Sequence, residues 1–246
     1  MPYMNDLPIL FHDESLIAIN KPYGWLTHKS PIARDVELIV LQQLRSQINA
    51  YVYPIHRIDR KTTGVLLFGL SPEIHRKMSA LFMQNLMSKD YFAIVRGYTS
   101  QNGIIDYDLK NESGKSQHAI TLYKTLLQSE IDLPSGKFDT SRYSLIHLQP
   151  KTGRMHQLRR HMSHIFHPII GDRPHGCNKQ NRLMKSHFGF TQMLLHARQL
   201  SFKHPLTNDA ISIKAPYFDE FKRMFNLLGL TQKKSNNHES WLDKNS

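Results

Sequence analysis

Apolar and polar residues alternate over the first part of the chain. Residues 9–22, ILFHDESLIAINKP, alternate around a turn at His12-Asp13-Glu14-Ser15 and predict a β-hairpin that ends at Pro22. Apolar residues at helical spacing then predict a helix from Asp35 to Ile48. A hairpin followed by a helix is therefore expected here.

A continuous apolar run, GVLLFGL at residues 64–70, suits a buried strand, although its periodicity alone does not distinguish a strand from a buried helix. Ser71-Pro72-Glu73 follows directly and supplies an N-cap, a proline at the first helical position and an early acid, so we expect a helix that continues to Leu86. Segments with branched and aromatic residues predict further strands at 90–97, 118–127, 142–148, 194–202 and 210–213.

Strands interrupted by occasional helices indicate α+β architecture rather than regular βαβ winding. We expect an N-terminal segment at residues 1–8 and one domain with two lobes at residues 9–230. Residues 231–246 are polar and poor in apolar side chains, which predicts a disordered tail.

The composition is basic, with 32 Lys and Arg against 20 Asp and Glu and a formal charge of +12 over 246 residues. Such a balance favours polyanionic partners, although a soluble protein can also be basic without binding one. The single cysteine, Cys177, excludes an internal disulfide and a thiolate-rich metal site. With no signal-like start and no long apolar run, we expect a cytoplasmic protein that is neither secreted nor membrane-spanning.

Asp59 lies between Arg57 and Arg60 in HRIDR, residues 56–60. Neighbouring cations favour the ionised form of a carboxylate, so Asp59 is a candidate catalytic anion. A structural ion-pair loop explains the same residues equally well.

A second cluster, GRMHQLRRHMSHIFHPIIGD at residues 153–172, predicts a helix that ends near Pro168. Its expected apolar stripe contains Met155, Leu158, Met162 and Ile165, and Arg159 falls at the boundary of this stripe, where it could face a site wall. A solvated basic face is the alternative interpretation.

Histidines 161, 164 and 167 invite a metal site, but the segment has no H-E-x-x-H and no cysteine pair, so we expect no metal there.

Two further segments carry residues of interest. GWLTHKS, residues 24–30, lacks the second glycine of a phosphate-binding G-x-x-x-x-G-K-[ST] loop, so nucleotide hydrolysis is not supported. KDYFAIVRG, residues 89–97, places Lys89 and Tyr91 on one face of a strand and Phe92 on the other. Tyr91 is either a core aromatic or a platform for a nucleobase.

Taken together and in order, these segments resemble the motifs of the RluA family of pseudouridine synthases. NKPYGWLTH is similar to the family's NKPxGxxxH, HRIDRKTTG to HRLDxxTSG, and KDYFAIVRG to KxYxAxVxG, while GRMHQLR, HPIIGD and LLHA complete the series. The match runs from about residue 9 to about residue 215, and Ile58 and Thr63 replace the commoner Leu and Ser. The chain begins directly at this region, so we expect no S4-type RNA-binding domain.

The resemblance implies a fold and an activity. The fold would be a mixed, largely antiparallel sheet in two lobes flanked by helices, with a catalytic cleft between the lobes. The activity would be isomerisation of uridine to pseudouridine in RNA, with no cofactor, by an enzyme expected to be monomeric. Three segments, INKPYGWLTHKS, GRMHQLRRHMSHIFHPIIGD and NRLMKSHFGFTQMLLHARQLSFKHP, resemble most the members that modify uridine-65 in the TΨC stem of tRNA.

The resemblance also implies residue roles. Asp59 matches the catalytic aspartate, Arg159 the arginine that pairs with it, and Tyr91 the tyrosine against the target base. Arg57 matches an arginine thought to fill the space left by the flipped nucleotide. Contacts with RNA are expected from the basic residues Arg57, Arg60, Lys89, Arg154, His156 and Arg160, and the positive surface could extend to Lys179 and Arg182.

Two alternatives remain open at this point. A ribosomal RNA could be the substrate, because related enzymes act on it with the same motifs. A non-catalytic RNA-binding or chaperone protein would satisfy the basic charge, but it gives no reason for Asp59, Tyr91 and Arg159 to occur together.

Overall fold

The computed structural model describes residues 6–28 and 38–231, which form two compact units. Unit 1 runs to Lys89 and includes Ala197–Pro216. Unit 2 contains Asp90–His196 and the chain from Tyr217 onward. Within the described ranges, no helix combines the length and the apolar character needed to cross a membrane.

Unit 1 is built around a sheet in which β1 and β2, β2 and β4, β3 and β4, and β11 and β12 form antiparallel pairs. Its strands occur in the order β1-β2-β4-β11, with β3 beside β4 and β12 beside β11. The helices and strands of this unit are β1 (Ile9–His12), β2 (Leu16–Lys21), α1 (Val40–Ile48), β3 (Tyr53–Pro54), β4 (Thr63–Gly69), α2 (Pro72–Met83), β11 (Leu195–Lys203) and β12 (Ala210–Lys214). Most of β11 belongs to this unit, and its first two residues belong to unit 2.

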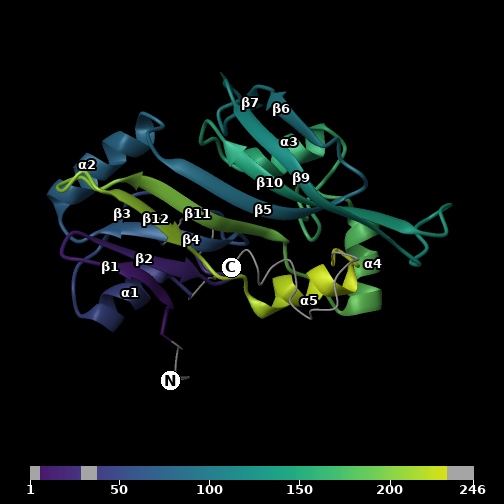
Figure 1. Cartoon of the computed structure of the whole chain (residues 1–246), viewed down its shortest axis with the longest axis horizontal. Helices are drawn as coiled ribbons and strands as arrows, with labels where there is room; N and C mark the ends of the chain where they lie inside the picture. Colours follow the sequence, from purple (N-terminus) through teal and green to yellow (C-terminus); the bar gives the residue numbers. More distant parts are fainter. Residues whose placement is uncertain (1–5, 29–37, 232–246) are drawn as a thin grey trace. The chain divides into compact units, whose positions relative to one another are not determined.

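The strand β4 is buried along its whole length because both faces of the unit 1 sheet are covered. Val65 and Leu67 pack in one cluster with Ile74 and other residues, whereas Leu66 and Phe68 pack in another that includes residues of α1. The helices α1 and α2 lie on opposite sides of the strands (Figure 1). Each buried side chain of this size contributes roughly 1.5–3 kcal/mol, which explains an apolar run without alternation.

Unit 2 also has an antiparallel sheet, with its strands in the order β5-β10-β9-β6. Its helices and strands are β5 (Ser88–Arg96), β6 (Asn102–Asp106), β7 (Leu109–Lys110), β8 (Ser116–Gln117), β9 (Ile120–Ile131), β10 (Ser141–Pro150), α3 (Gln157–His164), α4 (Asn178–Phe188) and α5 (Asp219–Leu227). The first two residues of β5 belong to unit 1.

The core of unit 2 joins the sheet to α4 and α5. Ile94 of β5 and Leu145 of β10 share one cluster with Met184 of α4 and Phe225 of α5. The two helices also meet directly, because Arg223 donates a hydrogen bond of 3.2 Å to the carbonyl of Phe188. This packing fixes α4 against the unit.

The predicted α+β class and largely antiparallel strand pairing are confirmed. The hairpin at residues 9–22 and the strand at 64–70 are present, as is the helix capped by Ser71, whose Oγ accepts a hydrogen bond of 3.2 Å from Ile74 N. That helix ends at Met83 rather than Leu86, because Asn85 takes a left-handed conformation with φ of 56°. The other predicted strands correspond to β5, β9, β10, β11 and β12.

Two predicted helices differ from the structure. The first begins at Val40, after non-helical Leu38 and Ile39, and its expected start at Asp35 lies outside the described residues. The helix predicted within residues 153–172 is only Gln157–His164. Its expected stripe is wrong at both ends, since Met155 is exposed ahead of the helix and Ile165 is its half-buried C-cap. The helices α4 and α5 were not predicted, and the expected tail from 232 onward lies outside the described residues.

Candidate active site

The loop that carries Asp59 joins β3 to β4 in unit 1. Ile58 beside it is buried, whereas Arg57 and Arg60 are exposed and Asp59 is half-buried. The amide of Thr62 donates a hydrogen bond of 2.9 Å to the carbonyl of Asp59, which closes a turn. Buried Ile58 and this turn present Asp59 at the surface of the unit.

Gly64 begins the buried part of the strand that follows this loop. Its φ is 110°, in the region that favours glycine. A Cβ at this position would collide with the carbonyl of Ala197 in the neighbouring strand β11. The backbones of β4 and β11 therefore approach too closely for any side chain at residue 64.

Lys21 fastens the Asp59 loop to the segment after β2. Its side chain is fully buried, and its ammonium donates to the carbonyls of Pro22, Trp25 and Arg60 at 2.9, 3.0 and 3.1 Å. Gly24 N also donates to Arg60 O at 3.0 Å. The residue next to Asp59 is thus held through its backbone by a buried cation.

The pKa of Lys21 is lowered from 10.5 to about 7. Burial is the main cause; the Asp59 carboxylate raises this pKa, and the Arg60 guanidinium lowers it. Asp59 therefore acts electrostatically on the lysine that anchors its own loop.

Because the pKa of Lys21 is lowered on folding, the free energy of unfolding should depend on pH. The unfolded chain holds this proton up to pH 10.5, whereas the folded chain releases it near pH 7, so the free energy of unfolding rises with pH across this window. The rise amounts to at most about 5 kcal/mol, at 1.36 kcal/mol per pH unit. We expect the Lys21→Met variant to lack it.

Urea unfolding of both proteins between pH 7 and pH 10 measures this difference. The control is Lys214→Met, which removes an exposed lysine from β12 of the same unit and should keep the wild-type pH profile. Parallel profiles for wild type and Lys21→Met would contradict the buried-cation account.

His56 and Lys89 lie against the same aromatic ring of unit 1. The His56 ring stacks on Phe82 with 5.3 Å between centroids, and Lys89 Nζ lies 4.8 Å from the Phe82 centroid. Burial, and then the Lys89 charge, lower the pKa of His56 to about 4, against a hydrogen bond with the Arg57 backbone that raises it. His56 Nε2 accepts a hydrogen bond of 3.1 Å from Leu67 N, which requires this nitrogen to be unprotonated.

Tyr91 lies on β5 in unit 2, opposite Leu148 of β10, and it is half-buried. Its neighbour Phe92 stacks on His147 across the strands, with ring centroids 5.2 Å apart. Strand alternation places the Tyr91 side chain on the opposite face from Phe92, as predicted.

Arg159 of α3 is buried in an ion pair with Asp172. Its Nε and Nη2 donate to the two carboxylate oxygens at 2.7 and 2.8 Å, and the side chains are 5% and 1% exposed. This two-point geometry fixes the plane of the guanidinium. Asp172 lies within the HPIIGD motif, but the sequence alone did not pair it with Arg159, and the expected pairing of Arg159 with Asp59 stays a prediction.

Gln157, the first residue of α3, positions the helix against β9. Its Nε2 donates to the carbonyl of Ile120 at 2.9 Å and to Thr121 Oγ1 at 3.0 Å. Its Oε1 accepts from Thr152 Oγ1 at 2.7 Å and from Arg154 N at 3.0 Å. The Gln157 amide therefore holds the first turn of the helix that carries Arg159.

His156 precedes the helix in a left-handed conformation, with φ of 54°. Non-glycine residues adopt this conformation at a cost, and functional sites collect such residues. His156 Nδ1 lies 2.9 Å from His175 Nε2, and His175 N donates to Asp172 Oδ1 at 3.3 Å. Burial, and then the Arg159 charge, lower the pKa of His175. Arg159 therefore contacts Asp172 directly, and His156 is connected to Asp172 through His175.

The three histidines considered for a metal have separate contacts. His161 lies 2.9 Å from Thr121 Oγ1 and 3.0 Å from the Tyr107 carbonyl, and burial lowers its pKa. His164 stacks on the ring of Tyr107, while His167 Nδ1 lies 2.9 Å from the Arg96 carbonyl. Among residues 6–28 and 38–231, the structure gathers no metal-binding group of His, Cys, Asp or Glu.

Several residues expected to contact RNA already donate to protein carbonyls. Arg60 Nε donates to Gly24 at 3.1 Å, Arg154 Nε to His118 at 2.9 Å, and Arg160 Nη1 to Lys110 at 2.9 Å. Lys89 is buried, with only 8% of its surface exposed. Of the predicted set, Arg57 and Arg60 are the exposed ones.

Curated relatives match nearly the whole chain. A protein of Haemophilus ducreyi named tRNA pseudouridine synthase C is 47% identical over 234 residues, covering 91% of this chain and 96% of the relative. Proteins with the same name from Vibrio parahaemolyticus and Yersinia pestis are 43% and 42% identical, covering 89% and 91% of this chain and 94% and 91% of their own lengths.

Solved structures agree on the fold. Human RNA pseudouridylate synthase domain containing 4 superimposes with a TM-score of 0.71 at 24% identity, over 92% of this chain and 95% of that one. The human domain-containing 1 protein gives 0.68 at 20% identity, over 94% and 97%. The model of the RNA pseudouridylate synthase family matches residues 15–164, a range that includes Asp59, Tyr91 and Arg159. With its motifs, its fold and this match in agreement, the chain belongs to the RNA pseudouridylate synthase family, and it is an isomerase.

Proposed function

We propose that this enzyme converts uridine-65 in the TΨC stem of tRNA to pseudouridine, with Asp59 as the catalytic carboxylate. The observation that carries the tRNA assignment is the identity of 42–47% to relatives named tRNA pseudouridine synthase C. The position within tRNA rests on the resemblance of three sequence segments to members with that target. Asp59 is proposed from HRIDRKTTG, the motif in which its half-buried carboxylate follows a buried isoleucine.

The reaction needs no external reactant. The bond from C1′ to N1 of uracil breaks, the base turns, and a bond from C1′ to C5 forms; C5 then loses its proton and N1 gains one. An ionised carboxylate can stabilise positive charge at C1′, assist loss of the C2′ proton, or add covalently to sugar or base. A hydrolytic glycosidase would instead use two carboxylates that flank the bond.

A target within a stem must leave the helix before it can react. Extruding a stacked base from A-form RNA costs a few kcal/mol, and stacking on an aromatic side chain recovers part of this cost. We assign that stacking role to Tyr91, which the motif KDYFAIVRG places at the position of the family's tyrosine. Arg57, from the other motif, would occupy the space that the base leaves.

Arg159 takes the role of an oriented cation. Asp172 holds its guanidinium at two points, and Gln157 fixes the start of its helix. A charge held in one orientation before the substrate arrives costs little reorganisation during the reaction. We propose that this arrangement lets Arg159 act on the catalytic carboxylate as the motif implies.

Release of tritium from C5-labelled uridine in unmodified tRNA tests the proposal. We expect the purified wild-type protein to release label and to place pseudouridine at position 65, as mapped on the product. The same mapping of tRNA and ribosomal RNA from a deletion strain should show one missing site in tRNA that the gene restores. Restoration of a ribosomal site would replace the substrate assignment, and RNA binding without any uridine conversion would overturn the enzymatic one.

A further inference from the structure

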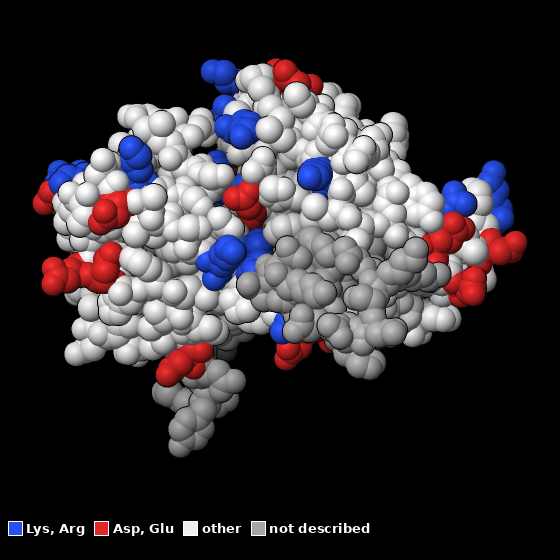
Figure 2. Space-filling model, viewed as in Figure 1, with Lys and Arg blue, Asp and Glu red and all other residues white. Residues whose placement is uncertain are grey.

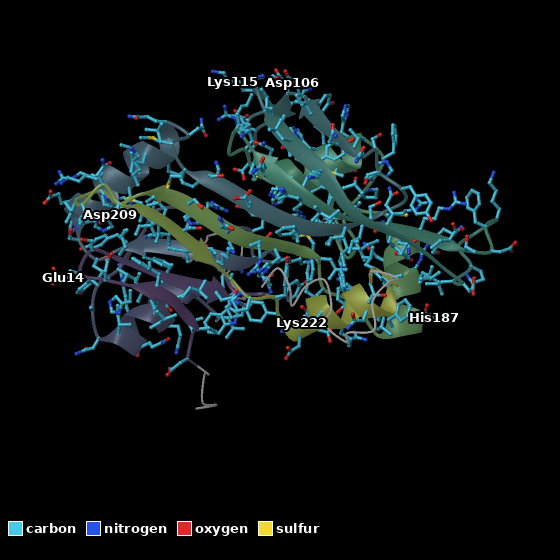
Figure 3. All side chains as sticks on the ribbon, in the orientation of Figure 1. Glu14, Asp106, Lys115, His187, Asp209 and Lys222 are labelled. Carbon is cyan, nitrogen blue, oxygen red and sulfur yellow. The ribbon has the colours of Figure 1, made fainter. Side chains whose placement is uncertain are left out.

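The helix α4 presents a basic surface that the predicted roles leave unused. Its sequence, NKQNRLMKSHF, contains Lys179, Arg182 and Lys185, all exposed, and no acidic residue. Its opposite side is buried through Gln180 and Met184. Figure 3 marks His187 near the C-terminal end of this helix. The charge of α4 therefore lies entirely on a solvent-facing side.

A hollow of about 280 Å³ lies beside this helix. Its cations are Arg173, Arg182 and Lys185, and its wall also includes Gly171 and Asn181. The described residues that line it include no Asp or Glu. Three cations around one hollow provide a local positive field, which attracts polyanions.

These three cations differ from the arginines predicted to bind RNA. Arg154 and Arg160 each donate to a backbone carbonyl of the protein. Within the described part of the chain, the side chains of Arg173, Arg182 and Lys185 make no hydrogen bond or ion pair. The residues at 6–28 and 38–231 therefore do not neutralise these three charges.

Basic side chains do not form a continuous area on every face of the molecule. On the face drawn in Figure 2, acidic and basic side chains are interspersed and form no continuous basic area. In contrast to that face, the described residues that line the hollow bring three cations together without an acid.

The hollow is joined to the Arg159 ion pair by Asn181. Its Oδ1 accepts a hydrogen bond of 3.0 Å from Gly171 N, and its Nδ2 donates to the carbonyl of Asp172 at 2.6 Å. The side chain of Asp172 holds Arg159. A phosphate bound beside Asn181 would therefore lie next to a side chain that is hydrogen-bonded to Asp172, the residue whose carboxylate holds Arg159.

We propose that this hollow, lined by Arg173, Arg182 and Lys185, binds backbone phosphates of the substrate RNA and so fixes the RNA relative to Arg159. The inference rests on the proposed function and names a contact surface for the same substrate. It adds Arg173 and Lys185 to the residues expected from sequence, and it makes unit 2 contribute to affinity through α4.

The test is the salt dependence of binding to an unmodified tRNA transcript. The variant R182A/K185A should bind about tenfold more weakly at low salt, and the slope of log K against log salt should fall by about 2, because two phosphate contacts are lost. The charge-retaining variant R182K/K185R should keep the wild-type slope. A matched control, K203A/K214A, removes two exposed lysines from β11 and β12 and should also keep it.

Each outcome is decisive. Melting curves should coincide for all variants, because the replaced side chains are exposed. An unchanged slope in R182A/K185A, or an equal fall in K203A/K214A, would overturn the phosphate site. Wild-type protein that binds tRNA but converts no uridine would refute the proposed function and leave the hollow intact. Conversion by the wild type together with unchanged slopes would refute the hollow alone.

Discussion

Asp59→Asn is expected to abolish pseudouridine formation while the protein stays folded. The substitution keeps the size of the side chain and removes the negative charge on which the proposed chemistry depends. Loss of such a group lowers the rate by about 10³-fold or more. The hydrogen bond that closes the turn should persist, since Thr62 N donates it to the backbone carbonyl of Asp59.

Tritium release from C5-labelled tRNA measures this loss, and tRNA binding by the same variant should remain. The control is Asp209→Asn, which neutralises an exposed carboxylate of unit 1, marked in Figure 3, and should retain activity. Turnover by Asp59→Asn near the wild-type rate would remove Asp59 from the chemistry.

Asp172→Asn is expected to lower the free energy of unfolding by about 3–5 kcal/mol. The substitution leaves the Arg159 guanidinium buried without its counter-charge and turns an amide donor toward another donor. Removing one partner of a buried pair costs more than removing both, because the remaining charge stays desolvated. R159M/D172M should therefore be less destabilised than the sum of its single variants.

Urea unfolding followed by circular dichroism measures these differences. The control is Glu220→Gln, which breaks the exposed pair with Arg223, where Nη2 lies 2.9 Å from the carboxylate. An exposed pair of this kind contributes about 1 kcal/mol or less. Equal effects of Asp172→Asn and Glu220→Gln would show that burial does not increase the contribution of the Arg159 pair to the free energy of unfolding.

The strands were predictable because their patterns are local. The run in β4 needs only the sequence of residues 64–70, and the turn at Asp13 marks the hairpin without knowledge of its surroundings. The helix α5 also carried a local signal, with Asp219 and Glu220 ahead of Phe221, Met224 and Phe225 at helical spacing. This signal would have identified the helix.

Other features depended on contacts between distant residues. The helix α4 has a largely polar sequence, and Cys177 provides no side-chain cap for it, so only packing of Met184 in the core reveals its inward side. The Arg159 partner lies 13 residues further along the chain, after an irregular segment. The burial of Lys21 follows from carbonyls of Pro22, Trp25 and Arg60, of which the last comes from another loop.

The site motifs were recognisable as a set, yet the groups that hold them were not. Asp59, Tyr91 and Arg159 each lie in a recognisable motif. Lys21 and Asp172 also lie in recognised motifs, NKPYGWLTH and HPIIGD, but only their hydrogen bonds show which groups they hold. A charge that supports a site differs little in sequence from a charge on the surface. Three-dimensional partners are needed to separate the two.

The close approach at Gly64 has a consequence for variation in this enzyme. A single added methyl group at residue 64 would push β4 away from Ala197 and carry the attached turn with it. The chemistry proposed for Asp59 is thus sensitive to a position that offers no functional group of its own. Backbone spacing favours glycine at residue 64, whereas the proposed role of residue 59 requires a negative charge.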